Sequence, residues 1–113
     1  MIRRILLAAA VLALGGAADA AAADRICTTE KGGKACFQPH GDHFTVSDER
    51  ANGAKPWVRW ETSYGRKGIC KPARGRATAH CNYNIRENER IRFRLELHGN
   101  GRFTLYGWLH ATT

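Results

Sequence analysis

Arginine and aromatic side chains alternate with apolar ones near the C-terminus of this 113-residue chain. Guanidinium groups bind phosphate and carboxylate, and aromatic rings stack on bases, sugars or other guanidinium groups. If the segment forms an antiparallel hairpin, every second side chain of each strand faces the same side. The alternation therefore predicts one basic and aromatic surface, a candidate binding site formed by Arg90, Arg92, Arg94, Tyr106, Trp108 and His110.

The loop of this hairpin decides which residues face each other. A two-residue turn at Asn100-Gly101 would mix polar and apolar residues on both faces, whereas a three-residue loop at 99–101 gives one apolar face. We therefore expect the longer loop, with His98 opposite Arg102. The expected apolar pairs are Leu97 with Phe103, Leu95 with Leu105 and Ile91 with Leu109.

The same register predicts the contacts on the other face. Arg92 is expected beside Trp108 and Arg94 beside Tyr106, close enough for guanidinium groups to lie over the rings. The alternative is that a second sheet covers Tyr106 and Trp108, with the arginine stems at its rim.

Glu61 offers a different chemistry if it meets the arginines and a histidine. In a secreted ribonuclease-like set, a carboxylate and a histidine share proton transfer while arginine stabilises phosphate. Small secreted microbial ribonucleases also carry a helix on their sheet, and we find no pattern for one. The chain has no Gly-x-Ser-x-Gly elbow, phosphate-binding glycine loop or His-Glu-x-x-His motif. We expect a non-catalytic protein without a cofactor.

The four cysteines are Cys27, Cys36, Cys70 and Cys81. In an exported chain they are expected to form two disulfides, each contributing about 2–4 kcal/mol to a small domain. The sequence leaves the pairing open. We favour Cys27 with Cys36 and Cys70 with Cys81, because each pair closes a short segment rich in turn residues.

Zinc is the alternative use of these cysteines, because His40, His43 and His80 lie near them in the sequence. However, there is no Cys-x-x-Cys pair, and an exported chain favours oxidised sulfur. We therefore expect no metal site.

The N-terminus has the pattern of an export signal. Arg3 and Arg4 precede an apolar run at 5–14, and small residues suited to cleavage end at Ala20 or Ala23. The run is about ten residues long, whereas a membrane span needs about 20. We predict a cleaved signal peptide over residues 1–23, followed by a single secreted, extracellular domain over 24–113 without a stable membrane anchor.

Short alternating segments between glycine, proline and asparagine clusters predict an all-β domain. Strands are expected near 35–38, 43–48, 56–64, 79–85, 90–98 and 102–110. We predict a small, disulfide-stabilised antiparallel β-sandwich of about six strands, with Trp60 and Val58 in the core and Trp57 exposed. His40 to His43 is expected to form a turn in which Asp42 binds backbone amides.

A set of residues spread over the whole mature chain resembles small secreted, uncharacterised β-rich disulfide proteins of actinobacteria. The matching positions are Ala35-Cys36-Phe37, Gly41-Asp42, Phe44, Val46, Asp48, Gly53, Trp60, Gly68, Cys70, Cys81-Asn82-Tyr83 and Glu87. The resemblance implies the fold and the compartment, and it brings no activity, ligand or catalytic residue.

The formal net charge of +8 favours acidic partners such as nucleic acid, anionic wall polymers or membrane headgroups, although the charge could also serve solubility alone. We expect a monomer that binds an extracellular partner, an anionic polymer, a glycan or a protein, through the basic and aromatic surface. The alternative is a protease inhibitor or antagonistic toxin that uses an expected glycine-rich and basic loop at 65–79.

Overall fold

The computed structural model describes residues 25–50, 53–99 and 101–113. The predicted signal peptide, residues 1–23, lies outside them. Within these ranges the chain forms nine strands and no helix, so the predicted all-β class is confirmed with more strands than expected. The strands are β1 (Ile26–Glu30), β2 (Gly33–Gln38), β3 (His43–Asp48), β4 (Lys55–Thr62), β5 (Lys67–Cys70), β6 (Thr78–Asn82), β7 (Arg90–Gly99), β8 (Arg102–Leu105) and β9 (Leu109–Thr112).

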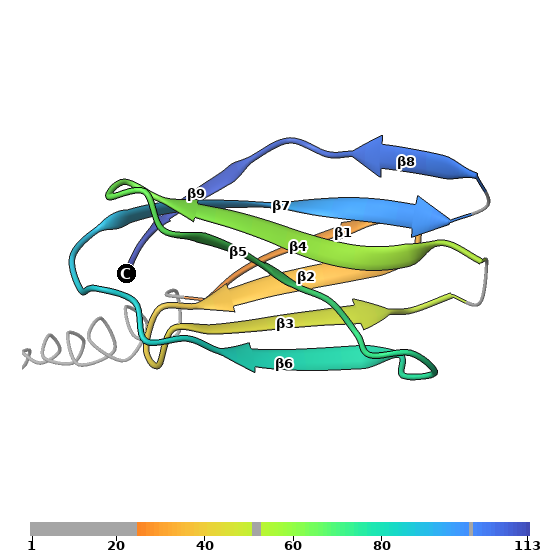
Figure 1. The fold of residues 1–113 in the computed structure, drawn as a ribbon, viewed down its shortest axis with the longest axis horizontal. Helices are drawn as coiled ribbons and strands as arrows, with labels where there is room; N and C mark the ends of the chain where they lie inside the picture. Colours follow the sequence, from red (N-terminus) through yellow and green to blue (C-terminus); the bar gives the residue numbers. More distant parts are fainter. Residues whose placement is uncertain (1–24, 51–52, 100) are drawn as a thin grey trace, which may run out of the picture.

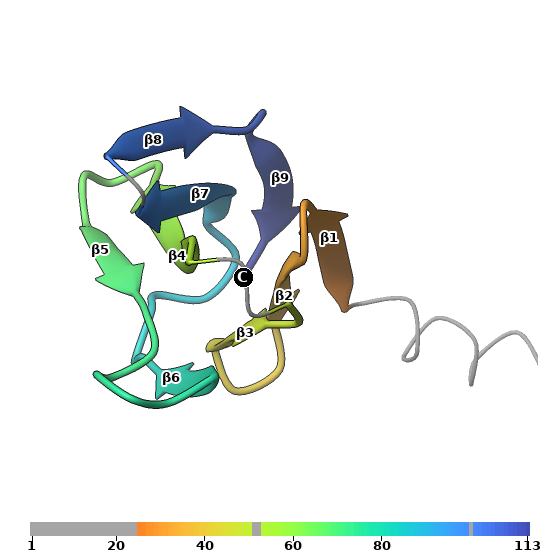
Figure 2. The same cartoon turned by 90° about the vertical axis from the view of Figure 1, so that its right-hand side faces the viewer.

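The strands form two antiparallel sheets that pack against each other (Figure 1). The first sheet has the order β1-β2-β3-β6, and the second has the order β5-β4-β7-β8, with β9 also paired to β7. Figure 2 shows the two layers from one end, with β5 above β6 on one side and β9 above β1 on the other. This arrangement is the predicted sandwich.

Alternation of side chains along each strand creates the core. On β4, Val58 and Trp60 point inward and are buried, whereas Trp57 points outward and is half-exposed, as predicted. The core between the sheets consists mainly of Ala35, Phe37, Phe44, Val46, Val58, Trp60, Ile91, Phe93 and Leu95. Because every second residue of β4 and β7 is committed to this core, the intervening polar residues are collected on the outer face of the second sheet.

The two disulfides join Cys27 to Cys36 and Cys70 to Cys81, the pairing favoured by the turn-rich segments. Cys27 lies directly opposite Cys36 on β1 and β2, within one sheet. Cys70 is on β5 and Cys81 is on β6, so this bridge connects one sheet to the other. Only the second bridge therefore fixes the sandwich itself.

The predicted loop of the last hairpin is wrong. Gly99 pairs with Arg102, so the connection is the two-residue turn that we rejected. Leu105 consequently lies opposite Glu96, and Phe103 lies opposite His98. Phe103 and Leu105 are on the outer face, with 56% and 44% of their surfaces exposed, instead of in the predicted apolar face.

A bulge after β8 shifts the register by one residue, so that β9 again directs His110 to the outer face, as predicted. Leu105 pairs with Glu96, but Leu109 pairs with Phe93, so one extra residue is accommodated between β8 and β9. Ile91 pairs with Ala111 instead of the predicted Leu109. The segment 102–110, expected as one strand, therefore forms two strands with different registers against β7. A prediction that assumes one register for the whole segment cannot describe both.

Part of the segment 65–79, which we expected to be a loop, forms β5. Lys67 to Cys70 pair with β4, and Gly68 lies against the indole of Trp60. The predicted turn at Asp42 is present, with the Asp42 amide donating a 3.2 Å hydrogen bond to the Pro39 carbonyl. The Asp42 carboxylate binds a backbone amide outside the turn, because its Oδ2 accepts a 3.0 Å hydrogen bond from Ile85.

Candidate functional site

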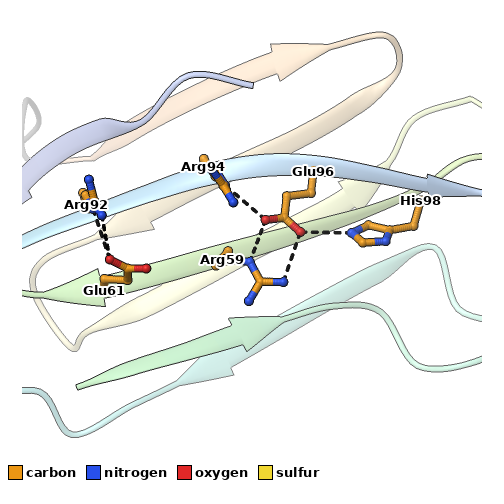
Figure 3. A network of polar contacts seen from close by, with 6 residues as sticks. All are labelled: Arg59, Glu61, Arg92, Arg94, Glu96 and His98. Atoms are coloured by element: carbon orange, nitrogen blue, oxygen red, sulfur yellow. Dashed lines mark hydrogen bonds and ion pairs between the residues drawn. The ribbon is translucent and has the colours of Figure 1, made fainter. Parts of the chain in front are cut away.

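Two neighbouring strands place alternating charged residues on the outer face of the second sheet. The register sets Glu61 of β4 opposite Arg92 of β7, Arg59 opposite Arg94, and Trp57 opposite Glu96. Figure 3 shows the charged side chains of both strands on this same side of the sheet. Their assembly follows from the pairing of β4 with β7, which the sequence prediction did not specify.

Trp108 is the centre of the cationic part of this face. The guanidinium carbons of Arg92 and Arg94 lie 4.1 and 4.5 Å from its ring centroid. The predicted contact of Arg92 with Trp108 is confirmed, whereas the predicted contact of Arg94 with Tyr106 is wrong. The indole of Trp108 is therefore half-buried, and two arginines cover its ring.

Tyr106 belongs to the core side of the sheet. Continuing the β8 register places it opposite Leu95, whose backbone oxygen accepts a hydrogen bond from the Tyr106 amide. Its ring packs against the core cluster. Of the six predicted surface residues, Tyr106 is thus separated from the others, and the bulge that begins after it turns Trp108 outward.

Glu96 also lies on this face, although it was not among the site residues predicted from the sequence. It is on the outward side of β7, yet its exposed fraction is 0%. Its carboxylate accepts hydrogen bonds from Arg59 Nε at 2.7 Å, Arg94 Nε at 3.1 Å and His98 Nε2 at 3.0 Å (Figure 3). These three side chains, which are themselves partly exposed, hold the buried charge.

The environment of Glu96 keeps it ionised. Burial alone would raise the pKa of its carboxyl group, but hydrogen bonds from Arg59, His98 and Arg94 outweigh burial and lower the pKa below its usual value. The hydrogen bond with Glu96 also raises the pKa of Arg59. Arg94 bonds Glu96 through Nε, so the network orients this arginine without using the terminal nitrogens of its guanidinium group.

Arg92 and Glu61 form the second ion pair of this face, at 2.8 Å. The hydrogen bond from Arg92 lowers the pKa of Glu61, so the carboxylate is ionised at neutral pH. Both residues line a pocket of about 470 Å³ together with Ser63, Arg90 and His110. No hydrogen bond or ion pair holds the side chain of Arg90 or His110 within the described ranges. The structure thus brings four of the predicted chemical residues together: Glu61, Arg90, Arg92 and His110.

An aromatic row lies beside the charged network. The ring of His98 is stacked on Trp57 at 3.8 Å and is 4.5 Å from Phe103. Lys71 also lies over the Trp57 ring, with its ammonium 4.2 Å from the ring centroid. The sequence identified Trp57 as an exposed aromatic residue, but Phe103 was assigned to the core because of the wrong hairpin register.

The described residues contain no group of three or more His, Cys, Asp or Glu side chains placed to hold a metal ion. All four cysteines are paired in disulfides. None of the described segments forms a helix with the length and hydropathy of a membrane span. The loop that we considered for protease contact, between β5 and β6, carries the exposed residues Arg74 and Arg76.

No family model, curated protein or solved structure matches the chain. The resemblance to secreted actinobacterial proteins therefore stays a prediction.

Proposed function

We propose that the protein is exported and binds an extracellular polyanion on the outer face of its second sheet. The observation that carries this proposal is the pocket in which Arg90, Arg92 and His110 gather. Among the described residues the side chain of Arg90 has no hydrogen-bond or ion-pair partner, and Arg92 retains a terminal nitrogen outside its two bonds to Glu61. Guanidinium donors of this kind match the oxygens of phosphate and carboxylate groups.

The surroundings of the pocket support a polymer instead of a single small anion. Arg94 and Arg59 continue the cationic row along β7 and β4, and Lys67 lies next to Glu61 across the β4–β5 pair. Glu61 and Glu96 hold three of these arginines in place, which reduces the conformational entropy that ligand binding must remove. The two disulfides are compatible with an oxidising extracellular compartment.

The experiment is an equilibrium titration of the oxidised protein with polyphosphate, polygalacturonate and neutral dextran at several salt concentrations. We expect binding to one or both polyanions, no binding to dextran, and an affinity that falls steeply with salt because counterions are released. Absence of binding to both polyanions at low salt would reject the proposal.

A second candidate function is cleavage of RNA in the same pocket, and it is favoured by the row Glu61, Arg92 and His110 across β4, β7 and β9. Glu61 would accept the proton of the ribose 2′-hydroxyl as its oxygen attacks phosphorus, while His110 would donate a proton to the leaving 5′-oxygen. Arg92 would stabilise the charge on the phosphorane. The P–O5′ bond breaks and a 2′,3′-cyclic phosphate forms.

Purified protein and its Glu61→Gln and His110→Gln variants distinguish the two candidates. The enzyme candidate is supported if the unmodified protein yields RNA cleavage products and both variants do not. Glu87→Gln, which changes an exposed carboxylate, is the control and should still cleave. Binding of RNA without cleavage would retain the polyanion proposal and reject the enzyme.

A further inference from the structure

The outer face of the first sheet carries a pair of histidines on neighbouring strands. His43 of β3 lies opposite Asn82 of β6, and His80 lies two residues before Asn82 on the same side of that strand. The imidazole atoms His43 Nε2 and His80 Nδ1 are 3.4 Å apart. The pair is on the opposite sheet from the proposed polyanion site, and that function does not use it.

Asn82 fixes the orientation of the first imidazole. Its Oδ1 is 2.6 Å from His43 Nδ1, and a carbonyl oxygen there accepts the Nδ1–H hydrogen. In the neutral ring the lone pair is then on Nε2, which is the atom directed at His80. A histidine with one ring nitrogen donated to an oxygen and the other turned toward a second histidine has the usual arrangement of a metal ligand and its supporting partner.

The separation of the two nitrogens has a direct chemical interpretation. A direct N–H···N hydrogen bond is shorter, near 3 Å, so 3.4 Å is long for one. Two nitrogens bound to tetrahedral zinc, with Zn–N bonds of about 2.0–2.1 Å, are separated by about 3.4 Å. The register of β3 and β6 and the contact with Asn82 therefore place the two imidazole nitrogens at the separation of two ligands of a tetrahedral transition metal.

We propose that His43 Nε2 and His80 Nδ1 bind a divalent transition metal ion of the zinc or copper class. The remaining coordination positions open into a pocket of about 290 Å³ that is also lined by Arg25, Gln38 and Thr45, which leaves room for water or a donor from another molecule. Because there are only two protein ligands and Arg25 lines the same pocket, we expect weaker binding than at a four-ligand structural zinc site. Unlike the zinc site considered from the sequence, this one uses neither cysteine nor His40.

The test is calorimetric titration of the oxidised, chelator-treated protein with Zn²⁺ and Cu²⁺ at pH 7.5, with Mg²⁺ as a cation that prefers oxygen ligands. We expect one bound Zn²⁺ or Cu²⁺ per chain and no Mg²⁺ binding. His43→Gln and His80→Gln should each weaken binding at least tenfold, and Asn82→Ala should weaken it by a smaller factor. The matched control is His110→Gln, which removes an exposed histidine from the other sheet.

NMR of the unmodified protein gives a readout that does not depend on the folding of a variant. Zn²⁺ should shift the ring signals of His43 and His80 and leave that of His110 in place. The proposal is overturned if no zinc or copper binds below millimolar concentration, if His110→Gln weakens binding as much as His80→Gln does, or if the shifted signals belong to other residues.

Discussion

Arg59 and Glu96 lie on neighbouring strands, and Arg59 Nε donates a 2.7 Å hydrogen bond to the carboxylate of Glu96. Glu96 is fully buried even though it is on the outer side of the sheet, because the side chains that bind it also cover it. A buried charge held in this way orients the arginines of the proposed binding face, and its removal leaves them without a common partner.

Replacing Glu96 by Gln should therefore destabilise the protein. The amide keeps the shape of the side chain but removes the charge that accepts bonds from Arg59, Arg94 and His98. Loss of charge-assisted hydrogen bonds is expected to cost about 1–3 kcal/mol, as measured by urea unfolding. Glu87→Gln is the matched control, because this exposed carboxylate has no ion pair in the described chain.

The same carboxylate predicts how stability depends on pH. The folded-state pKa values of Glu96 and Glu61 are lowered, so their contribution is complete above the unfolded-state pKa of about 4.3 and is lost as the pH falls through the lower folded values. The free energy of unfolding should fall below about pH 4 less steeply in Glu96→Gln than in the unmodified protein. Equal acid dependence of the two proteins would contradict this role of Glu96.

Gly68 should be required for the packing of Trp60. A Cβ atom at Gly68 would lie 2.7 Å from Trp60 Cζ2, whereas a Cβ atom at Gly107 would meet nothing within 4 Å. Because Trp60 is buried and cannot move aside without disturbing the core, Gly68→Ala is expected to cost about 1–3 kcal/mol. Thermal unfolding of Gly68→Ala and Gly107→Ala compares the two, and similar midpoints would show that the indole is not confined as described.

The two disulfides should contribute unequally. Their sequence separations of 9 and 11 residues are similar, so their effects on the entropy of the unfolded chain are similar, at about 2–4 kcal/mol each. However, Cys70 belongs to the core cluster and its bridge joins the two sheets, whereas Cys27 is exposed and its bridge to the buried Cys36 stays within one sheet. The Cys70→Ala/Cys81→Ala double variant should therefore be less stable than Cys27→Ala/Cys36→Ala by about 1–2 kcal/mol. The reverse order in urea unfolding would be inconsistent with this packing.

The register of the last hairpin can be tested through Phe103. Because its ring is on the outer face, Phe103→Ser should change the free energy of unfolding by about 1 kcal/mol or less, while Phe93→Ala in the core should cost about 3–5 kcal/mol. A loss at Phe103 as large as that at Phe93 would support the three-residue loop instead.

Local patterns predicted much of this fold. Alternation along the segment that forms β4 identified Trp60 as core and Trp57 as outward, and the turn-rich segments favoured the two disulfide pairs that the structure contains. These features depend on neighbours in sequence, where side-chain parity and short loops are informative.

Features that depend on several strands at once were not predicted. The extra residue between β8 and β9 changes the register within one segment, so a single parity argument assigned Tyr106 and Phe103 to the wrong faces. The burial of Glu96 requires Arg59, which is brought alongside only by the pairing of β4 with β7. Strand β5 was missed because glycine is typical of turns, whereas Gly68 lies within a strand. Its lack of a side chain allows the backbone to approach the Trp60 ring closely.

In the proposed function the pocket of Arg90 and Arg92, and not the net charge in general, binds the polyanion. The most direct measurement compares the polyphosphate affinity of Arg90→Gln/Arg92→Gln with that of Arg74→Gln/Arg76→Gln, which removes the same charge from the exposed loop between β5 and β6. We expect at least a tenfold loss for the first pair and a twofold to threefold loss for the second, because about one direct phosphate contact is removed at each pocket arginine. Equal losses in the two double variants would contradict the claim.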